Sequence, residues 1–302
     1  MDKRLPRTEM LFSLGFIFML ALVVASFFLG MKIGVERTEA KYAPEPEETK
    51  TQAVTAYQQQ DLLSYYYTVY EPFRSFSGEW IAEASKMKSG QTADPSKRLK
   101  ALSSAAADRY KEAERADMPA SSPLLVDAQT NALRSLKLFS EAFTRYASES
   151  GDAQTVIRLI GEDALYREAL DYALLAEKQY FEAMVMWGAS LDPDFPNGVP
   201  EDGSGMAIEA WKRQPLLVKN AIAAGLLKER RILQNYYPQD LTARLDHFIE
   251  SGQAAGLGIK TVGEAVDLLV RTEAIRSGDF LEKRSAYVSG ELLPQIPMFS
   301  AG

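Results

Sequence analysis

Cysteine is absent from this chain of 302 residues, and histidine occurs once, as His247. A chain without cysteine forms no disulfide, no thiolate zinc site and no lipid-modified lipoprotein cysteine. One histidine is also too few for a histidine-rich zinc site. Its apolar neighbours Leu245, Phe248 and Ile249 indicate a helix, so we expect a structural or surface role for it.

Motifs of several enzyme classes are missing as well. The sequence has neither Gly-x-Gly-x-x-Gly nor Gly-Lys-Ser/Thr, the glycine-rich patterns that hold phosphates. It also lacks the Glu-x-x-His pairs with which helical bundles bind two iron ions. We therefore expect no enzyme activity, no catalytic residue, no bound metal and no cofactor.

Positive charge is not in excess. The formal net charge is −7, and the first nine residues hold three basic and two acidic side chains, which leaves −8 for the rest. The phosphates of nucleic acid repel a body of that sign. The densest basic cluster, Lys228 to Arg231, is interrupted by Glu229. We therefore expect no nucleic-acid partner.

One long apolar run dominates the N-terminal region. Residues 10–31 carry no charge across 22 positions, and as a helix they span about 33 Å, the thickness of a bilayer core. After a short basic tail at residues 1–9, the sequence predicts one transmembrane signal-anchor helix over residues 10–34, in contact with membrane lipid. The alternative is a signal peptide cleaved after Ala25, although Phe27 to Met31 prolong the run beyond the usual length of such a segment.

Flanking charge does not decide the orientation of this helix. The basic residues within about 15 positions are Lys3, Arg4 and Arg7 before it and Lys32, Arg37 and Lys41 after it. Equal numbers leave the positive-inside rule without a preference. Because the short basic tail has the form of a signal anchor, we expect a single-pass protein of the cell membrane with a cytoplasmic N-terminus and an extracytoplasmic body.

Small residues gather on one side of the same segment. Gly15, Ser26, Gly30 and Gly34 share a face at 100° per residue, and the last three form a small-x-x-x-small pattern. Such a pattern lets two membrane helices approach closely. This face is a candidate for self-association, although small residues are common in membrane helices in general.

Helical periodicity characterises the rest of the chain. Residues 35–50 include a Pro/Glu-rich stretch and are predicted to be an extended linker. Beyond it, apolar residues recur every three or four positions, and no run alternates as a strand would. The sequence therefore predicts an all-α body: an antiparallel four-helix bundle at residues 51–188, an acidic Pro/Gly loop at 189–205 and a C-terminal helical subdomain at 206–302.

Local signals mark the ends of these helices. Asp94-Pro95 and Ser122-Pro123 are typical of an N-cap followed by proline, and Gly151-Asp152 precedes a fourth helix that is expected to reach Trp187. A capping box at Thr261 to Glu264 begins a later helix. The shorter C-terminal helices are expected at 206–236 with a break or bend near Pro215, at 239–252, at 262–277 and at 279–290.

An aromatic cluster is the most unusual local composition. Possible ligand or partner contacts are Tyr65, Tyr66, Tyr67, Tyr70 and Trp80. Consecutive helical side chains point about 100° apart, so at least one of the three adjacent tyrosines must be exposed. Aromatic side chains are enriched at binding surfaces as well as in cores. Pro72 should kink this helix near Thr68 to Tyr70.

Three further segments favour structural roles. The oxygen-rich loop residues Asp192, Asp194, Asn197, Glu201 and Asp202 do not have the spacing of a calcium-binding loop and indicate a solvated acidic loop. Glu162, Asp163, Glu168 and Asp171 are typical of a charged outer face. The apolar tail at residues 292–299 is expected to pack on the body, with a partner contact as the alternative.

Together these observations favour a membrane-anchored, non-enzymatic helical protein. We expect an interaction or scaffold module of the cell envelope that binds a protein partner or associates with itself. The alternative is an extracytoplasmic sensory or solute-binding helical domain, with a cavity lined by residues such as Tyr66, Tyr70 and Tyr146.

Overall fold

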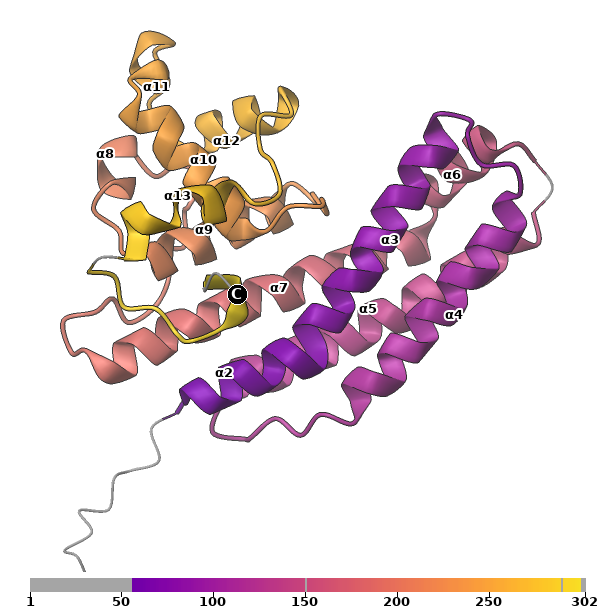
Figure 1. The fold of residues 1–302 in the computed structure, drawn as a ribbon, viewed down its shortest axis with the longest axis horizontal. Helices are drawn as coiled ribbons and strands as arrows, with labels where there is room; N and C mark the ends of the chain where they lie inside the picture. Colours follow the sequence, from indigo (N-terminus) through magenta and orange to yellow (C-terminus); the bar gives the residue numbers. More distant parts are fainter. Residues whose placement is uncertain (1–55, 150, 289, 300–302) are drawn as a thin grey trace, which may run out of the picture. The chain divides into compact units, whose positions relative to one another are not determined.

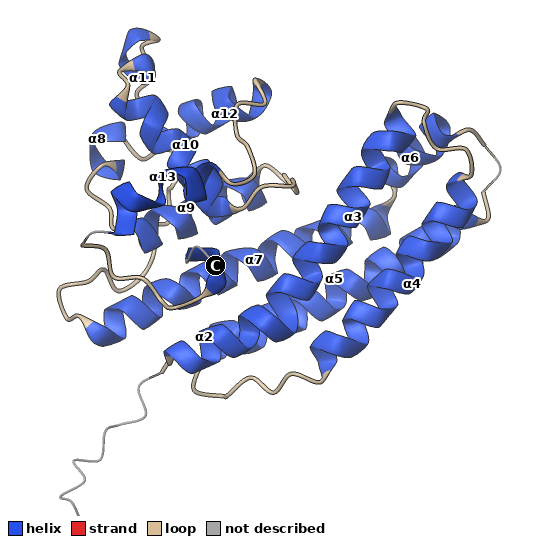
Figure 2. Cartoon of the chain, in the orientation of Figure 1, coloured by secondary structure: helices blue, strands red, loops and turns tan. Residues whose placement is uncertain are grey.

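The computed structural model describes residues 56–149, 151–288 and 290–299, and within them every regular element is a helix (Figures 1 and 2). The expected all-α class with bundle-like packing is confirmed for these residues. Their one extended pairing is a β-bridge between Ala207 and Thr261. In the same ranges, no helix combines the length and apolar character of a membrane span. The predicted anchor and linker, residues 10–34 and 35–50, lie outside the described residues.

The long helices form the first part of the body. They are α2 (Gln59–Tyr65), the π-helical turn η1 (Tyr66–Tyr70), α3 (Glu71–Lys88), α4 (Pro95–Glu114), α5 (Pro123–Ala147), α6 (Ala153–Glu162) and α7 (Ala164–Leu191). Helix α5 packs against both α4 and α7, and α3 packs against α4. Figure 1 shows each long helix running back beside the one before it. An aromatic core cluster that includes Phe76, Trp80, Phe139 and Phe143 fills the space between them.

Shorter helices complete the body. They are α8 (Ile208–Trp211), α9 (Leu216–Glu229), α10 (Pro238–Glu250), α11 (Gln253–Gly256), α12 (Val262–Arg271), α13 (Asp279–Val288) and the 3₁₀ turn η2 (Pro297–Phe299). Helix α9 packs against α7 and α10, and ten of its 14 residues are buried. A helix that is apolar on every side suits this central position. One core cluster joins α7 to α9 and α10, so residues on both sides of the 189–205 loop share it.

The expected single fourth helix is wrong, because α6 and α7 are separate helices. Asp163 has an extended backbone between them, and its carboxylate accepts the N–H groups of Leu165 and Tyr166. The same carboxylate accepts hydrogen bonds from Arg145 at 2.7 Å and from the Tyr146 hydroxyl at 3.0 Å. A side chain that caps one helix and pairs with a neighbouring one ends α6 and begins α7. Asp163 is therefore buried, contrary to the expected charged outer face.

Two other expectations need correction. Helix α5 begins at Pro123 as expected, but Ser122 does not cap it. The Ser122 hydroxyl instead donates to Asp61 at 2.9 Å and accepts the N–H of Tyr57 at 3.2 Å, which ties the start of α2 to the start of α5. The break expected near Pro215 is confirmed between α8 and α9, but the predicted end at residue 236 is wrong, because α9 ends at Glu229.

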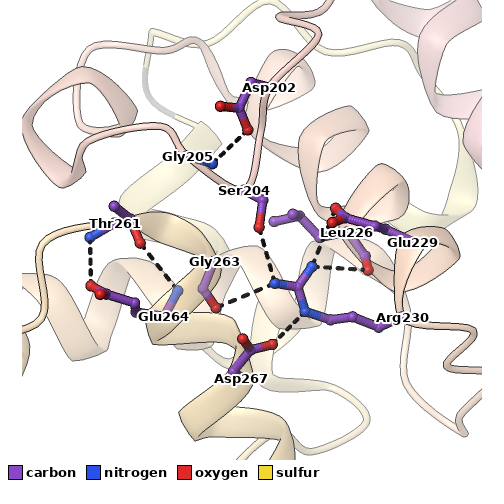
Figure 3. A network of polar contacts seen from close by, with 10 residues as sticks. All are labelled: Asp202, Ser204, Gly205, Leu226, Glu229, Arg230, Thr261, Gly263, Glu264 and Asp267. Atoms are coloured by element: carbon purple, nitrogen blue, oxygen red, sulfur yellow. Dashed lines mark hydrogen bonds and ion pairs between the residues drawn. The ribbon is translucent and has the colours of Figure 1, made fainter.

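A polar network joins the start of α12 to the loop before α8 (Figure 3). Arg230, at the end of α9, donates to Ser204 at 3.2 Å and to the carbonyl of Gly263 at 3.4 Å, and it pairs with Asp267. A Cβ atom on Gly263 would lie 2.4 Å from the Ser204 hydroxyl and 2.7 Å from its carbonyl oxygen. Glycine is required at this close approach. The predicted capping box of Thr261 is present beside it and is confirmed.

Candidate functional site

A π-helical turn sets the directions of the clustered tyrosines. The N–H of Glu71 donates to the carbonyl of Tyr66, five residues earlier, at the end of η1. Pro72 follows directly and supplies no N–H for a regular helical bond to Thr68. The Thr68 hydroxyl donates to the Ser64 carbonyl at 2.8 Å. The structure has this π-turn at the place where the sequence predicts a kink, near Thr68 to Tyr70. Turns of this form are common at functional sites.

Most of the aromatic cluster belongs to the core. Tyr65 and Tyr70 are 1% and 3% exposed, and both rings pack on Tyr180 with centroids 4.6 and 4.9 Å away. Trp80 is 3% exposed and donates from its ring N–H to the Tyr166 hydroxyl at 3.2 Å. In this arrangement these three predicted contact residues touch other side chains of the body rather than solvent.

Tyr67 is different, because 58% of it is exposed. The expectation that one of the three adjacent tyrosines faces solvent is thereby confirmed. Tyr66 is partly buried, and its ring lies edge-on to that of Tyr67 with centroids 5.2 Å apart. Of the five predicted contact residues, Tyr67 therefore offers the largest exposed surface, with Tyr66 supporting it from one side.

Tyr67 lines an apolar groove of about 540 Å³, which we call the Tyr67 groove. Its lining residues are Leu63, Tyr67, Arg284, Leu293, Pro294, Gln295, Ile296, Pro297 and Phe299. Helix α2 and the π-turn form one wall, and the C-terminal segment forms the other. That segment is fixed on the body because Ile296 is fully buried and Phe299 nearly so. The expected packing of the apolar tail is confirmed.

Arg284 is the charged side chain of the groove. Its Nε donates to the carbonyl of Phe299 at 2.6 Å, which holds the end of the described chain against α13. A guanidinium has five N–H donors in a planar fork, so this bond leaves others for a carboxylate. The groove can therefore bury apolar side chains and accept one negative charge beside them.

A buried polar group lies behind the tyrosines. Tyr70 donates to Glu177 at 2.8 Å, and Arg74 lies 3.4 Å from the same carboxylate oxygen. Burial and the nearby carboxylate of Glu177 raise the pKa of Tyr70 well above its usual value, so its hydroxyl is a neutral donor. Arg74 also donates to the carbonyls of Gln234 and Tyr236 at 3.2 and 2.9 Å. This group joins α3, α7 and the loop before α10.

The sequence offers a signal for this group that periodicity alone overlooks. Arg74 follows Phe73 on the apolar side of its helix, and Glu177 lies one turn from both Ala173 and Tyr180 on the inner face of α7. Two opposite charges on inward faces indicate a buried ion pair. Their pairing across 103 residues becomes evident only in the folded chain.

The remaining candidate residues do not converge. His247 is exposed, and so are Glu162, which pairs with Arg158, and Glu168. Asp171 pairs with Arg231 at 2.7 Å. In residues 56–149, 151–288 and 290–299, no group of three or more acidic or histidine side chains is placed to hold a metal ion. The proposed association face of Gly15, Ser26, Gly30 and Gly34 lies outside these ranges.

Comparison with known proteins found no matching family model, no matching curated protein and no matching solved structure. Any functional reading of this chain therefore rests on its own residues.

Proposed function

We propose that this chain is a membrane-tethered, non-enzymatic interaction module that docks an extended apolar segment of a partner protein in the Tyr67 groove. The observation that carries the proposal is the exposure of Tyr67 in a groove whose lining is mostly apolar, with Arg284 as its charged side chain. Tyrosines in such positions are frequent anchors of binding energy, since the ring buries a large apolar area with few rotatable bonds.

The chemistry of the walls favours side-chain burial over strand pairing. Pro294 and Pro297 have no backbone N–H, so this edge of the C-terminal segment is poorly suited to pairing with an added strand. Leu63, Leu293 and Tyr67 offer apolar surface instead. Arg284 favours a segment with one carboxylate next to its apolar residues, whereas a strongly acidic partner is repelled by the net charge of the body.

The tether is the predicted anchor at residues 10–34, joined to the body by the predicted linker at 35–50. The apolar run and its lack of charge support it. Sodium carbonate extraction of membranes followed by protease treatment of spheroplasts tests it. The proposal predicts that the intact chain stays in the membrane pellet and that added protease digests the body. A chain released by carbonate, or a body protected from the protease, contradicts it.

Site-specific photo-crosslinking tests the docking. The full chain carries p-benzoylphenylalanine at position 67 or, as a control, at position 257, where Leu257 is 63% exposed. We expect a discrete product at position 67 whose crosslinked peptide is an apolar segment bearing a carboxylate. A synthetic copy of that peptide must also bind the purified chain. Equal products at both positions, or products with lipid alone, would refute the docking proposal.

The solute-binding alternative is not favoured at the place first expected. Tyr66, Tyr70 and Tyr146 line none of five hollows on the described part of the body. Tyr70 packs on other rings, and the Tyr146 hydroxyl bonds to Asp163. A different hollow, lined by residues such as Tyr236, Leu269 and Glu273, is better suited to a small ligand.

A further inference from the structure

A second hollow, separate from the Tyr67 groove, lies between the loop before α10 and the end of α12. Its volume is about 400 Å³, and it is lined by Gln234, Asn235, Tyr236, Leu269, Val270, Glu273, Ile275 and Ser277. It shares no lining residue with the groove. We call it the Glu273 pocket.

The floor of the Glu273 pocket is apolar and its rim is polar. Leu269 and Ile275 are buried, while Gln234, Asn235 and Ser277 are exposed. Burial raises the pKa of Tyr236 to about 12, so its hydroxyl stays protonated at neutral pH. Ligand sites commonly combine an apolar floor with a few polar groups that fix orientation.

The charge of this pocket distinguishes it from the others. Glu273 is its one ionisable side chain at neutral pH, and no lysine or arginine lines it. Four other hollows on the described part of the body are each lined by at least one lysine or arginine. Leu269 and Val270 belong to the last turn of α12, and the C-terminal end of a helix also favours a cation.

The backbone fixes both walls. Glu273 has φ of +52°, and the bonds from Glu273 N–H to Val270 and from Ala274 N–H to Leu269 close the end of α12 around it. A non-glycine residue in this left-handed conformation incurs a cost that glycine would not. The opposite wall is fixed because buried Arg74 holds the carbonyls of Gln234 and Tyr236. A pocket built on fixed walls is suited to a small ligand.

We infer that the Glu273 pocket binds a small organic ammonium ion, with the charged nitrogen at the Glu273 carboxylate and an apolar portion over Leu269 and Ile275. This inference does not depend on the proposed docking function. The net charge of −8 outside the N-terminal tail adds a favourable long-range field for a cation.

Methyl NMR spectroscopy of the full chain in nanodiscs tests this inference with three probes of matched shape. Phenethylammonium is the cation, phenethyl alcohol the neutral analogue and 3-phenylpropionate the anion. We expect phenethylammonium to shift the methyl signals of Leu269, Val270 and Ile275 with a Kd of about 1 to 10 mM. At the same concentrations the alcohol should bind about threefold or more weakly than phenethylammonium, and the anion more weakly than the alcohol.

Glu273→Gln removes the charge and keeps the shape of the side chain. It should weaken phenethylammonium binding about threefold or more, while methyl signals elsewhere report an unchanged fold. Glu209→Gln is the matched control, because Glu209 is an exposed carboxylate on α8 outside the pocket, and this variant should bind as the parent does. The inference is overturned if the alcohol binds as tightly as phenethylammonium or if Glu273→Gln binds as tightly as the parent chain. It is also overturned if phenethylammonium causes no shift at 50 mM, which is about five times the weakest expected Kd.

Discussion

At the scale of single residues, Asp163 joins the start of one helix to side chains of another. Its carboxylate caps α7 and accepts hydrogen bonds from Arg145 and Tyr146. We predict that Asp163→Ala lowers the free energy of unfolding by about 2 to 3 kcal/mol, the sum of a lost cap and lost buried partners. Asp152→Ala removes an exposed cap of α6 without buried partners and should cost less than Asp163→Ala. Urea denaturation followed by circular dichroism measures both, and equal losses would contradict this role.

The same carboxylate makes stability depend on pH. Burial by itself raises the pKa of Asp163, but hydrogen bonds from Tyr166, Tyr146 and Leu165 and the charge of Arg145 outweigh it and hold the pKa below its usual value. Stability from this group is therefore present above the unfolded pKa and is lost as pH falls through the folded pKa. We predict a smaller loss of stability below about pH 4 in Asp163→Asn than in the parent chain. Parallel acid profiles would rule this out.

The carboxyl of Asp240 makes stability depend on pH in the opposite direction. Burial raises the pKa of this carboxyl above its ordinary value, although it accepts the N–H groups of Tyr237 and Phe280. Its contribution to stability is therefore present below the unfolded pKa and is lost as pH rises through the folded pKa. An acid profile of the parent chain contains both effects, which is why the Asp163→Asn comparison is needed to isolate one of them.

At the scale of elements, close backbone contact determines how α12 joins the loop before α8. We predict that Gly263→Ala destabilises the chain by about 2 kcal/mol, because the new methyl group meets Ser204 backbone and side-chain atoms. Gly161→Ala, also in a helix but with no atom within 4 Å of the added Cβ, should stabilise it by about 0.5 to 1 kcal/mol. Thermal unfolding of both variants measures these two changes in stability. A stabilising Gly263→Ala would show that the contact relaxes easily.

Helix starts were predictable from sequence where the signal was local. Asp94 caps α4, Asp152 caps α6 and Thr261 caps α12, each through hydrogen bonds that involve residues a few positions away. The role of Ser122 was not predictable, because its partner Asp61 lies 61 residues earlier in the chain. The break at Asp163 depended on Arg145 and Tyr146 of another helix. Local rules fail where a long-range partner competes for the capping side chain.

The candidate site was predictable to a similar extent. Consecutive tyrosines at 100° spacing require an exposed member, and Tyr67 is that member. Helical spacing could not show that Arg284 and the 293–299 segment face Tyr67, since this contact joins positions more than 200 residues apart. The Glu273 pocket was not predictable from the sequence, because the loop before α10 and the end of α12, which form its walls, contain no binding motif.

At the scale of the whole molecule, the buried pair of Arg74 and Glu177 joins three distant segments. Each side chain is less than a tenth exposed, so removing one partner leaves a buried charge. We predict that Arg74→Met costs about 3 to 5 kcal/mol, and that Arg74→Met with Glu177→Met costs less than the sum of the two single changes by about 2 kcal/mol. Denaturant titration of the four proteins completes the cycle. Additive losses would show that the pair is not coupled.

The groove gives the whole molecule its proposed role as a tethered docking module, and one titration tests that role most directly. The peptide identified by crosslinking at position 67 is titrated by calorimetry into the parent chain, Tyr67→Ser and the control Leu257→Ser, which replaces another exposed apolar side chain. We predict that Tyr67→Ser weakens binding about tenfold or more and that Leu257→Ser leaves it unchanged. Equal affinity of Tyr67→Ser and the parent chain would contradict docking in the Tyr67 groove.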